Sequence, residues 1–517
     1  MNKIEVPKLT VTPGPDALRI DETGKELKRG ALFNTIALLA SNFRGVFTFL
    51  VARLLGPAVL GLFSVAWATT DIISKIGIFG LDNAITTFIA RSEALGDHAR
   101  SRTLFRFAVA LAVAQSIVIA LISIVATQLL GRRLNLQPEL ISALSVIFCA
   151  LPGIALYRMC TSVSRGMKVM HHDIYSSGIT EPIATTLAFL IAFFVGFKEF
   201  GPELAAIIGT AASGIVALVF ASRLFRNAPA GHGNMSIRSE TWQLLGYAAP
   251  ISAYQLLNTF ISRLDVIMLG FFIGRAPGVT LAMVGVYGAV VDTANGLRKV
   301  NQAFNPIFAP VVAGMTATGD HERAEATYAR LAEWMLWILL PMVAVMALAG
   351  STILLIYGPA FRQGGELLGV VGVAAATNAF VSLGETVIMV QRPRLNLLNS
   401  SITCLFAAGV LWWLIPRYGV PGAAFGILLP NIVQGILRYV ALRWVFHWKH
   451  SWDHLRPPVI AAIIAIVPAL VCRVLLHGII GQLTASAVFV AVFAAAWKYY
   501  GVSLSLGKLR KASNKYT

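Results

Sequence analysis

The chain has 517 residues, of which 57% are hydrophobic and 13% charged, and its formal net charge is +18. A soluble protein usually carries about 25% charged residues, so this composition, with a mean hydropathy of +0.73, excludes a soluble globular protein. The apolar runs are continuous and roughly 20 residues long, which predicts membrane-spanning helices rather than the short alternating strands of a barrel.

The first 29 residues are polar and rich in proline and charge, and we expect a disordered cytosolic tail there. No short apolar run with a cleavage site precedes the first span, so no signal peptide is predicted. About fourteen apolar segments of spanning length follow the tail. They are 31–54, 59–80, 106–130, 139–160, 175–197, 203–222, 243–273, 281–312, 331–350, 365–390, 394–416, 420–442, 457–476 and 479–499.

An internal repeat divides the spans into two halves. GLFSVAWATTD at 61–71 resembles GVYGAVVDTAN at 285–295, and two further pairs of similar segments follow in the same order. Matching helices enter the membrane from the same side, which predicts two parallel six-helix lobes around a central cavity. The predicted parts are a tail (1–29), an N-lobe of six spans (30–225), a cytosolic linker (226–241), a C-lobe of six spans (242–446), two further spans (447–501) and a basic cytosolic tail (502–517).

The placement of lysine and arginine predicts the orientation. Most lie in connections on the side of the N-terminus, as expected of cytosolic loops, which places both termini in the cytosol. This positive charge faces anionic lipid and needs no nucleic-acid partner to explain it. The opposite connections carry only Arg53, Arg132, Arg133, Lys198, Arg275, Arg362, Arg417 and Arg473.

Several cations nevertheless lie within the spans, where a charge costs roughly 3 kcal/mol unless it faces protein or water. They occur in the first, second, seventh and eighth spans, which the repeat relates in pairs. We therefore expect them to line one central, water-filled cavity, where the fork of arginine suits a phosphate ligand. The predicted cationic residues are Arg44, Lys75, Arg263, Arg298 and Lys299.

Polar residues share helix faces with these cations. Thr48 falls on the stripe of Arg44 in the first span, and Asp292 falls on the stripe of Lys299 in the eighth. The acidic members are candidates for coupling transport to a proton or sodium gradient. The polar candidates for the cavity are Asn34, Asp71, Glu181, Asn258, Asp265, Asp292 and Glu385.

A structural role remains the alternative for each of these residues, because polar side chains also join packed membrane helices. Asp71 and Lys75, four residues apart on one helix, are compatible with a local ion pair. No motif of a hydrolase, metalloprotease or nucleotide-binding enzyme is present. The four cysteines lie in apolar segments without paired spacing. We expect no catalytic residue, no metal site and no cofactor.

One stretch resembles a known family. In VARLLGPAVLGLFSVAWATTDIISKIGIFGLDNAITTFIAR, residues 51–91, a helix ends in RLLGP, GLF opens the next helix, and GLD precedes FIAR. RLDVIMLGFFIG with VGVYGAVV, within 263–290, matches the start of the family's second half. The chain resembles oligosaccharide and polysaccharide flippases, of the O-antigen and exopolysaccharide type, in the multidrug/oligosaccharidyl-lipid/polysaccharide exporter superfamily.

The resemblance implies a cycle between inward-open and outward-open states of the two lobes. The cargo would be an undecaprenyl-diphosphate-linked oligosaccharide, moved across a bacterial cytoplasmic (inner) membrane for surface polysaccharide assembly. Arg44 and Arg263 match regions whose arginines are thought to hold the diphosphate in the family. The resemblance implies no enzymatic step; membrane lipids and polysaccharide polymerase or export proteins would be the partners.

Other functions stay open at this point. A multidrug and toxin extrusion antiporter shares the architecture but exports organic cations, which calls for an acidic, aromatic cavity. A lipid II flippase often has an aspartate directly after the first-span arginine, whereas Gly45 follows Arg44 here. A polysaccharide polymerase or ligase usually has a large outer loop, and a scaffold protein would leave the charges in the spans unexplained.

Overall fold

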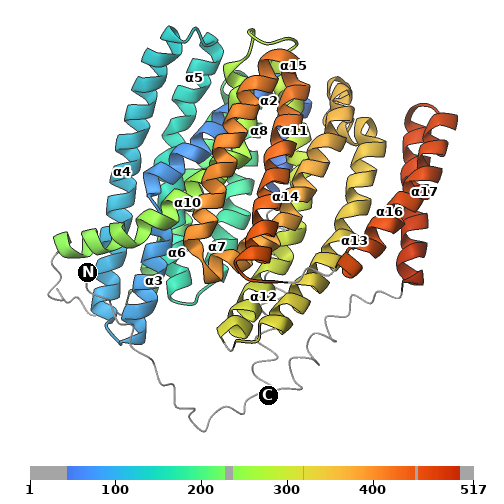
Figure 1. The fold of residues 1–517 in the computed structure, drawn as a ribbon. Helices are drawn as coiled ribbons and strands as arrows, with labels where there is room; N and C mark the ends of the chain where they lie inside the picture. Colours follow the sequence, from blue (N-terminus) through green and yellow to red (C-terminus); the bar gives the residue numbers. More distant parts are fainter. Residues whose placement is uncertain (1–42, 227–236, 318, 449–451, 501–517) are drawn as a thin grey trace.

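The computed structural model describes residues 43–226, 237–317, 319–448 and 452–500. Every regular element among them is a helix, so the predicted all-helical fold is confirmed (Figure 1). The first half contains α2 (Phe43–Ile78), α3 (Leu81–Ala94), α4 (His98–Arg133), α5 (Pro138–Ile147), η1 (Phe148–Ala150), α6 (Leu151–Gly166), α7 (His171–Asp173), the π-helical η2 (Ile174–Thr180), α8 (Glu181–Val195) and α9 (Gly201–Leu224).

The second half begins with the long helix α10 and ends with a helix pair at the edge of the molecule. Its elements are α10 (Ile237–Phe271), α11 (Leu281–Ala294), η3 (Asn295–Leu297), α12 (Arg298–Ala317), α13 (His321–Leu354), η4 (Pro359–Gly364), α14 (Gly365–Gln391), α15 (Pro393–Trp444), η5 (Trp452–His454), α16 (Arg456–Leu475) and α17 (Gly478–Tyr499).

Ten helical stretches in the described residues are long and apolar enough to cross a membrane. Two of them each take in residues of two predicted spans. α2 bends at Gly56, between 31–54, of which the structure describes residues 43–54, and 59–80; α15 bends at Gly419, between 394–416 and 420–442. The φ angles of these glycines are 83° and 61°, in the left-handed region that glycine adopts without a Cβ clash. α10, and α11 with α12, cover two further predicted spans. The total of about fourteen spans stays a prediction.

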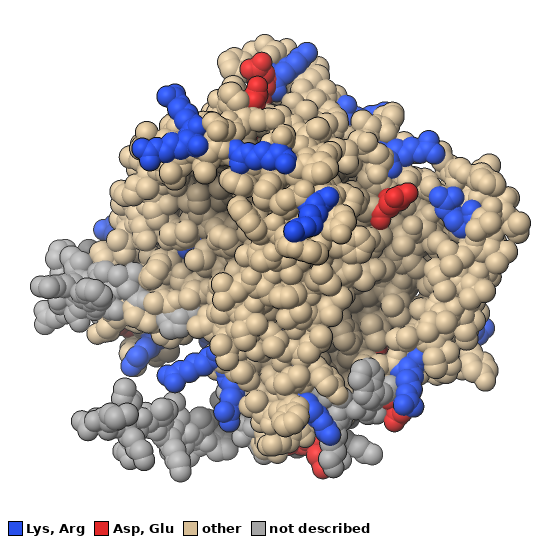
Figure 2. Space-filling view, turned by 45° about the horizontal axis from the view of Figure 1, so that its top comes forward, with Lys and Arg blue, Asp and Glu red and all other residues tan. Residues whose placement is uncertain are grey.

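The outer surface is that of a protein surrounded by lipid. Apolar side chains stand exposed along α4, α8, α15 and α16, with Phe194 81% and Leu405 76% exposed. Patches of this kind on a soluble protein would cause association. Figure 2 shows charged residues on the top face and along the lower edge, with an almost uncharged band between them. The chain is a multi-pass membrane protein.

The two halves meet where α2 packs against α10 and α11. Glycines allow the backbones of α2 and α11 to approach closely: a Cβ on Gly61 would lie 2.9 Å from the backbone nitrogen of Gly285. α2 runs from its bend at Gly56 toward α3, and we call the end of the molecule where α2 leads into α3 the α3 end. The predicted lobe boundaries remain predictions.

The last two helices lie outside this arrangement. α16 and α17 pack against α13 at the right-hand edge of Figure 1. They share a separate apolar cluster, which contains Trp337 of α13, Ala465 of α16 and Phe489 of α17.

Candidate functional site

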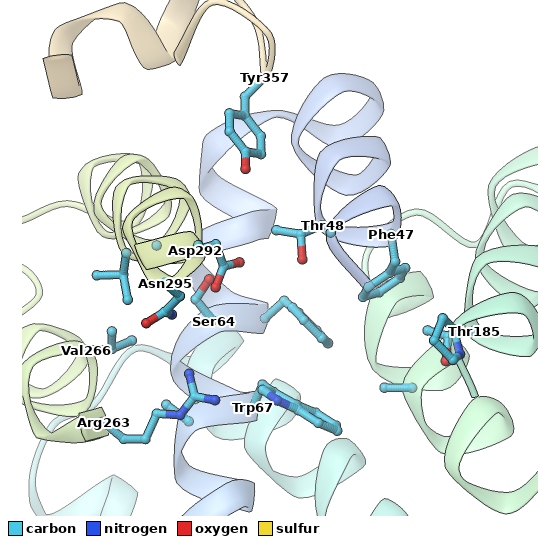
Figure 3. Close-up of a pocket in the computed structure, with 18 of the residues that line it drawn as sticks. Phe47, Thr48, Ser64, Trp67, Thr185, Arg263, Val266, Asp292, Asn295 and Tyr357 are labelled. Atoms are coloured by element: carbon cyan, nitrogen blue, oxygen red, sulfur yellow. The ribbon is translucent and has the colours of Figure 1, made fainter. Parts of the chain in front are cut away.

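A cavity of about 350 Å³ lies at the centre of the molecule. Residues of α2, α8, α9, α10, α11, η3 and α12 line it (Figure 3). The 3₁₀ turn η3 interrupts the predicted span 281–312, and its Asn295 and Gly296 form part of the wall. The helix therefore tightens from α to 3₁₀ geometry where it reaches the cavity, and a 3₁₀ stretch within a helix often marks a functional hinge.

Two of the predicted cations face the cavity. Arg263 extends from α10, and Lys299 lies in the first turn of α12. Figure 3 shows the guanidinium of Arg263 directed into the space between Asn295 and Trp67. The side chain of Arg263 is 27% exposed, so its charge is only partly solvated.

Two predicted acidic residues also line the cavity. Asp292 comes from α11, near Ser64 of α2 in Figure 3, and Glu181 stands at the start of α8. Asp292 and Lys299, seven positions apart on the stripe predicted for the eighth span, both line the cavity. Thr48, Ser64 and Thr185 add hydroxyl groups, and Phe47, Phe63 and Trp67 add aromatic surface.

Asp71 has partners other than the local one considered from the sequence. Its Oδ2 accepts from Nε of Arg263 at 3.2 Å, and its Oδ1 accepts from Nη2 of Arg158 at 3.5 Å. No ion pair within 4.0 Å joins Asp71 to Lys75 in the part of the chain that the structure describes. The spacing of four residues did not decide the pairing, because two guanidinium groups from other helices reach the carboxylate.

Sequence reasoning missed Arg158. It lies near the end of the predicted span 139–160, where a basic residue resembles an ordinary helix end at the cytosolic surface. In the fold its side chain is only 19% exposed and meets Asp71. One signal in the sequence could have identified Arg158: it lies two residues before the end of the predicted span, inside the membrane segment.

Asp265 points away from the cavity. It is 1% exposed, and its Oδ2 accepts a hydrogen bond from the hydroxyl of Tyr287 at 2.7 Å. The expectation that Asp265 lines the cavity is therefore wrong: on a helix two residues turn the side chain by about 200°, and Arg263 takes the cavity side. Lys75 and Arg298 are not among the lining residues either.

Asn258 and Glu385 belong to a different polar cluster, which likewise lies outside the cavity wall. Nδ2 of Asn258 donates to Oε1 of Glu385 at 3.2 Å, and Nη2 of Arg438 donates to Oε2 at 2.6 Å. This cluster joins α10, α14 and α15. Arg438 was also missed, because it lies near the end of the predicted span 420–442.

The first span is described only in part. Asn34 lies outside the described residues, and so does the side chain of Arg44, although its backbone is in the first turn of α2. Gly45, Phe47 and Thr48 line the cavity directly after it. The described residues contain no group of three His, Cys, Asp or Glu side chains arranged to hold a metal ion.

A second cavity of about 430 Å³ lies between α13, α14, α15 and the segment that leads to α16. Tyr328, Trp448 and Glu325 are among its lining residues, and Arg438 forms part of the wall. It therefore adjoins the cluster of Glu385 and is separate from the central cavity.

A bundle of membrane helices around a polar central cavity is the architecture of a membrane transporter or flippase. The family model for polysaccharide biosynthesis proteins matches residues 27–312, more than half of the chain, and the chain belongs to that family. The resemblance to this superfamily of flippases is thereby confirmed. No curated protein matches the sequence.

Solved structures share the fold. The lipid II flippase MurJ, in an inward closed conformation, has a TM-score of 0.73 at 9% identity, covering 91% of this chain and 98% of its own. An inward-facing MATE family multidrug resistance transporter of the MOP superfamily has a TM-score of 0.68 at 14% identity, covering 79% and 94%. A mutant of the Vibrio cholerae MATE transporter VcmN has 0.59 at 18% identity, covering 83% and 98%.

Proposed function

We propose that this protein moves an undecaprenyl-diphosphate-linked oligosaccharide from the inner to the outer leaflet of a bacterial cytoplasmic membrane. The observation that carries the proposal is the pair of basic groups, Arg263 and Lys299, that two helices direct into the central cavity. Membership of the polysaccharide biosynthesis family supports a carbohydrate-bearing cargo. No chemical step is needed; the barrier is the transfer of a charged, hydrated head group through lipid.

The cavity offers groups for both parts of that head group. Arginine binds a phosphate with two parallel hydrogen bonds, and lysine adds a point charge. Hydroxyl and amide groups of Thr48, Ser64 and Asn295 replace water around a sugar. The cavity has a volume of about 350 Å³. In this proposal it receives the diphosphate and the sugar next to it, and the halves separate to admit a longer oligosaccharide.

The cavity would open alternately to the two sides of the membrane, so that one site takes up the cargo from the inner leaflet and releases it into the outer leaflet. Within the proposal both termini are cytosolic, and Glu181, Asp292 and Asp71 are the candidates for coupling to a proton or sodium gradient. A polysaccharide polymerase or export protein would receive the product in the outer leaflet.

The second candidate is export of organic cations in exchange for an ion. It is favoured by the two carboxylates of the cavity, Glu181 and Asp292, and by the aromatic surface of Trp67 and Phe47. Aromatic faces and carboxylates both attract organic cations. We rank it second because Arg263 and Lys299 would repel such a cargo.

Reconstitution in liposomes tests the proposal. Purified protein is placed in vesicles that contain a polyprenyl-diphosphate oligosaccharide, and an added glycosidase reports the fraction of sugar that has moved. We expect translocation by the wild type and a loss of about 10- to 100-fold in Arg263→Ala and Lys299→Ala, since a hydrogen bond to a charged group contributes about 1.5–3 kcal/mol.

Matched controls are available on the surface. Arg417→Ala and Lys198→Ala remove side chains of the same two types from exposed positions outside the cavity and should translocate like the wild type. Efflux of ethidium from the same vesicles tests the second candidate. Ethidium transport without movement of the lipid-linked sugar contradicts the proposed cargo.

A further inference from the structure

The carboxylate of Asp71 lies between two guanidinium groups that come from opposite halves of the chain. Arg158 approaches from α6 at 3.5 Å, and Arg263 approaches from α10 at 3.2 Å. Side chains of all three residues are less than 30% exposed, at 20% for Asp71, 19% for Arg158 and 27% for Arg263. Water therefore screens this cluster only weakly.

Asp71 engages one edge of Arg263. The hydrogen bond uses Nε, whereas Nη1 and Nη2 have no hydrogen-bond partner among the described residues. Figure 3 shows the guanidinium end of this side chain directed into the cavity. Asp71 itself is not a lining residue; it lies one helical turn beyond Trp67 toward the α3 end. The carboxylate thus binds Arg263 at Nε, on the side away from the cavity, and leaves Nη1 and Nη2 available to a ligand.

Arg158 determines the net charge of the cluster that it forms with Asp71 and Arg263. One carboxylate paired with one guanidinium is neutral, and such a pair would attract an anion weakly. Because Arg158 shares the same carboxylate, the three side chains carry a net charge of +1. The three side chains therefore keep one net positive charge beside the cavity while Asp71 fixes the orientation of Arg263.

We propose that Asp71 and Arg158 form a positioning unit for Arg263, which presents its Nη1 and Nη2 atoms to a diphosphate in the cavity. This inference rests on the proposed function and adds two residues to it. Asp71 and Arg158 belong to the first half and Arg263 to the second, so the unit exists only while α2 and α10 are in contact. The affinity for the anionic cargo then depends on the arrangement of the halves.

Paired variants separate positioning from simple charge. Asp71→Asn keeps an oxygen that accepts from Nε, whereas Asp71→Leu removes the acceptor. Binding of geranylgeranyl diphosphate and of inorganic pyrophosphate is measured by calorimetry in detergent; the first probe tests a lipid-linked diphosphate and the second a free one. We expect wild-type or tighter binding in Asp71→Asn and about tenfold weaker binding of the lipid diphosphate in Asp71→Leu.

Arg158 provides the second pair. Arg158→Lys retains the charge and should bind like the wild type, whereas Arg158→Leu should bind several-fold more weakly although it does not line the cavity. If Asp71→Asn and Asp71→Leu both tighten binding equally, Asp71 is only a competing negative charge and the positioning role is wrong.

A cross-linking experiment distinguishes a wrong positioning role of Asp71 from a wrong assignment of the cargo. The side-chain oxygens of Thr87 on α3 and Tyr247 on α10 lie 3.4 Å apart at the α3 end. With both replaced by cysteine in a background without the four native cysteines, a short bis-maleimide reports contact of the halves there. A wild-type protein that binds neither diphosphate refutes the cargo. The positioning unit is then upheld if Asp71→Leu alone loses the cross-link, and refuted if all variants retain it.

Discussion

Arg438 and Glu385 join α15 to α14 through a contact of 2.6 Å between Nη2 and Oε2. The arginine side chain is 3% exposed, and the carboxylate also accepts from Asn258 of α10. A charge left without its partner in such a place is costly, whereas an apolar replacement of both partners can be nearly neutral.

We expect Arg438→Leu or Glu385→Leu alone to lower the free energy of unfolding by about 3–5 kcal/mol, because each leaves a buried charge unpaired. The double variant should lose less than either single variant. Thermal unfolding in detergent, followed by a dye that reacts with the fully buried thiol of Cys160, measures this. Single losses that add up in the double variant would contradict an energetic coupling between the two side chains.

The close approach of α2 and α11 gives a second prediction. A Cβ on Gly285 would meet the carbonyl oxygen of Pro57 and lie 2.8 Å from the backbone nitrogen of Gly61. Backbone atoms cannot rotate away, so Gly285→Ala must push the helices apart and should cost about 1–3 kcal/mol. Gly409→Ala is the control, since a Cβ at this position of α15 would have no atom within 4 Å. It should be neutral or stabilising by up to about 1 kcal/mol.

The docking of α17 gives a third prediction. Oε1 of Gln482 accepts from the backbone nitrogen of Thr352 at 3.0 Å and from its hydroxyl at 2.6 Å. Gln482→Leu removes the acceptor of both hydrogen bonds at a half-buried contact, so the free energy of unfolding should fall by about 1–3 kcal/mol. Translocation per folded molecule should stay unchanged, because neither residue lines the central cavity. Thr484→Val, whose hydroxyl donates to backbone oxygens of its own helix, serves as the control.

The first-span arginine gives a fourth prediction. Thr48, one turn after Arg44, lines the cavity. If the polar stripe predicted for this span continues to Arg44, Arg44→Ala should lower translocation about 10- to 100-fold, as one charge-assisted contact is lost. Arg53→Ala removes an exposed arginine from the other end of the same helix segment and should have no effect. If Arg44→Ala translocates at the same rate as Arg53→Ala and the wild type, Arg44 has a structural role.

The amino-acid sequence by itself determined the class of fold and the approximate place of the long apolar helices. Bilayer thickness sets the length of an apolar span, and the period of 3.6 residues sets which side chains share a face. Both are local properties of the chain. For that reason the spans, and the face shared by Asp292, Asn295 and Lys299, were predictable without tertiary structure.

The tertiary structure alone decided which partner each face meets. Helical periodicity relates Asp71 to Lys75 but says nothing of Arg263, 192 positions away, or of Arg158, 87 positions away. The rotation of each helix about its axis depends on packing along all its sides, including the glycine contact of Gly61 with Gly285. Two positions on α10 place Arg263 and Asp265 on opposite faces, and the packing decided which of these faces meets the cavity.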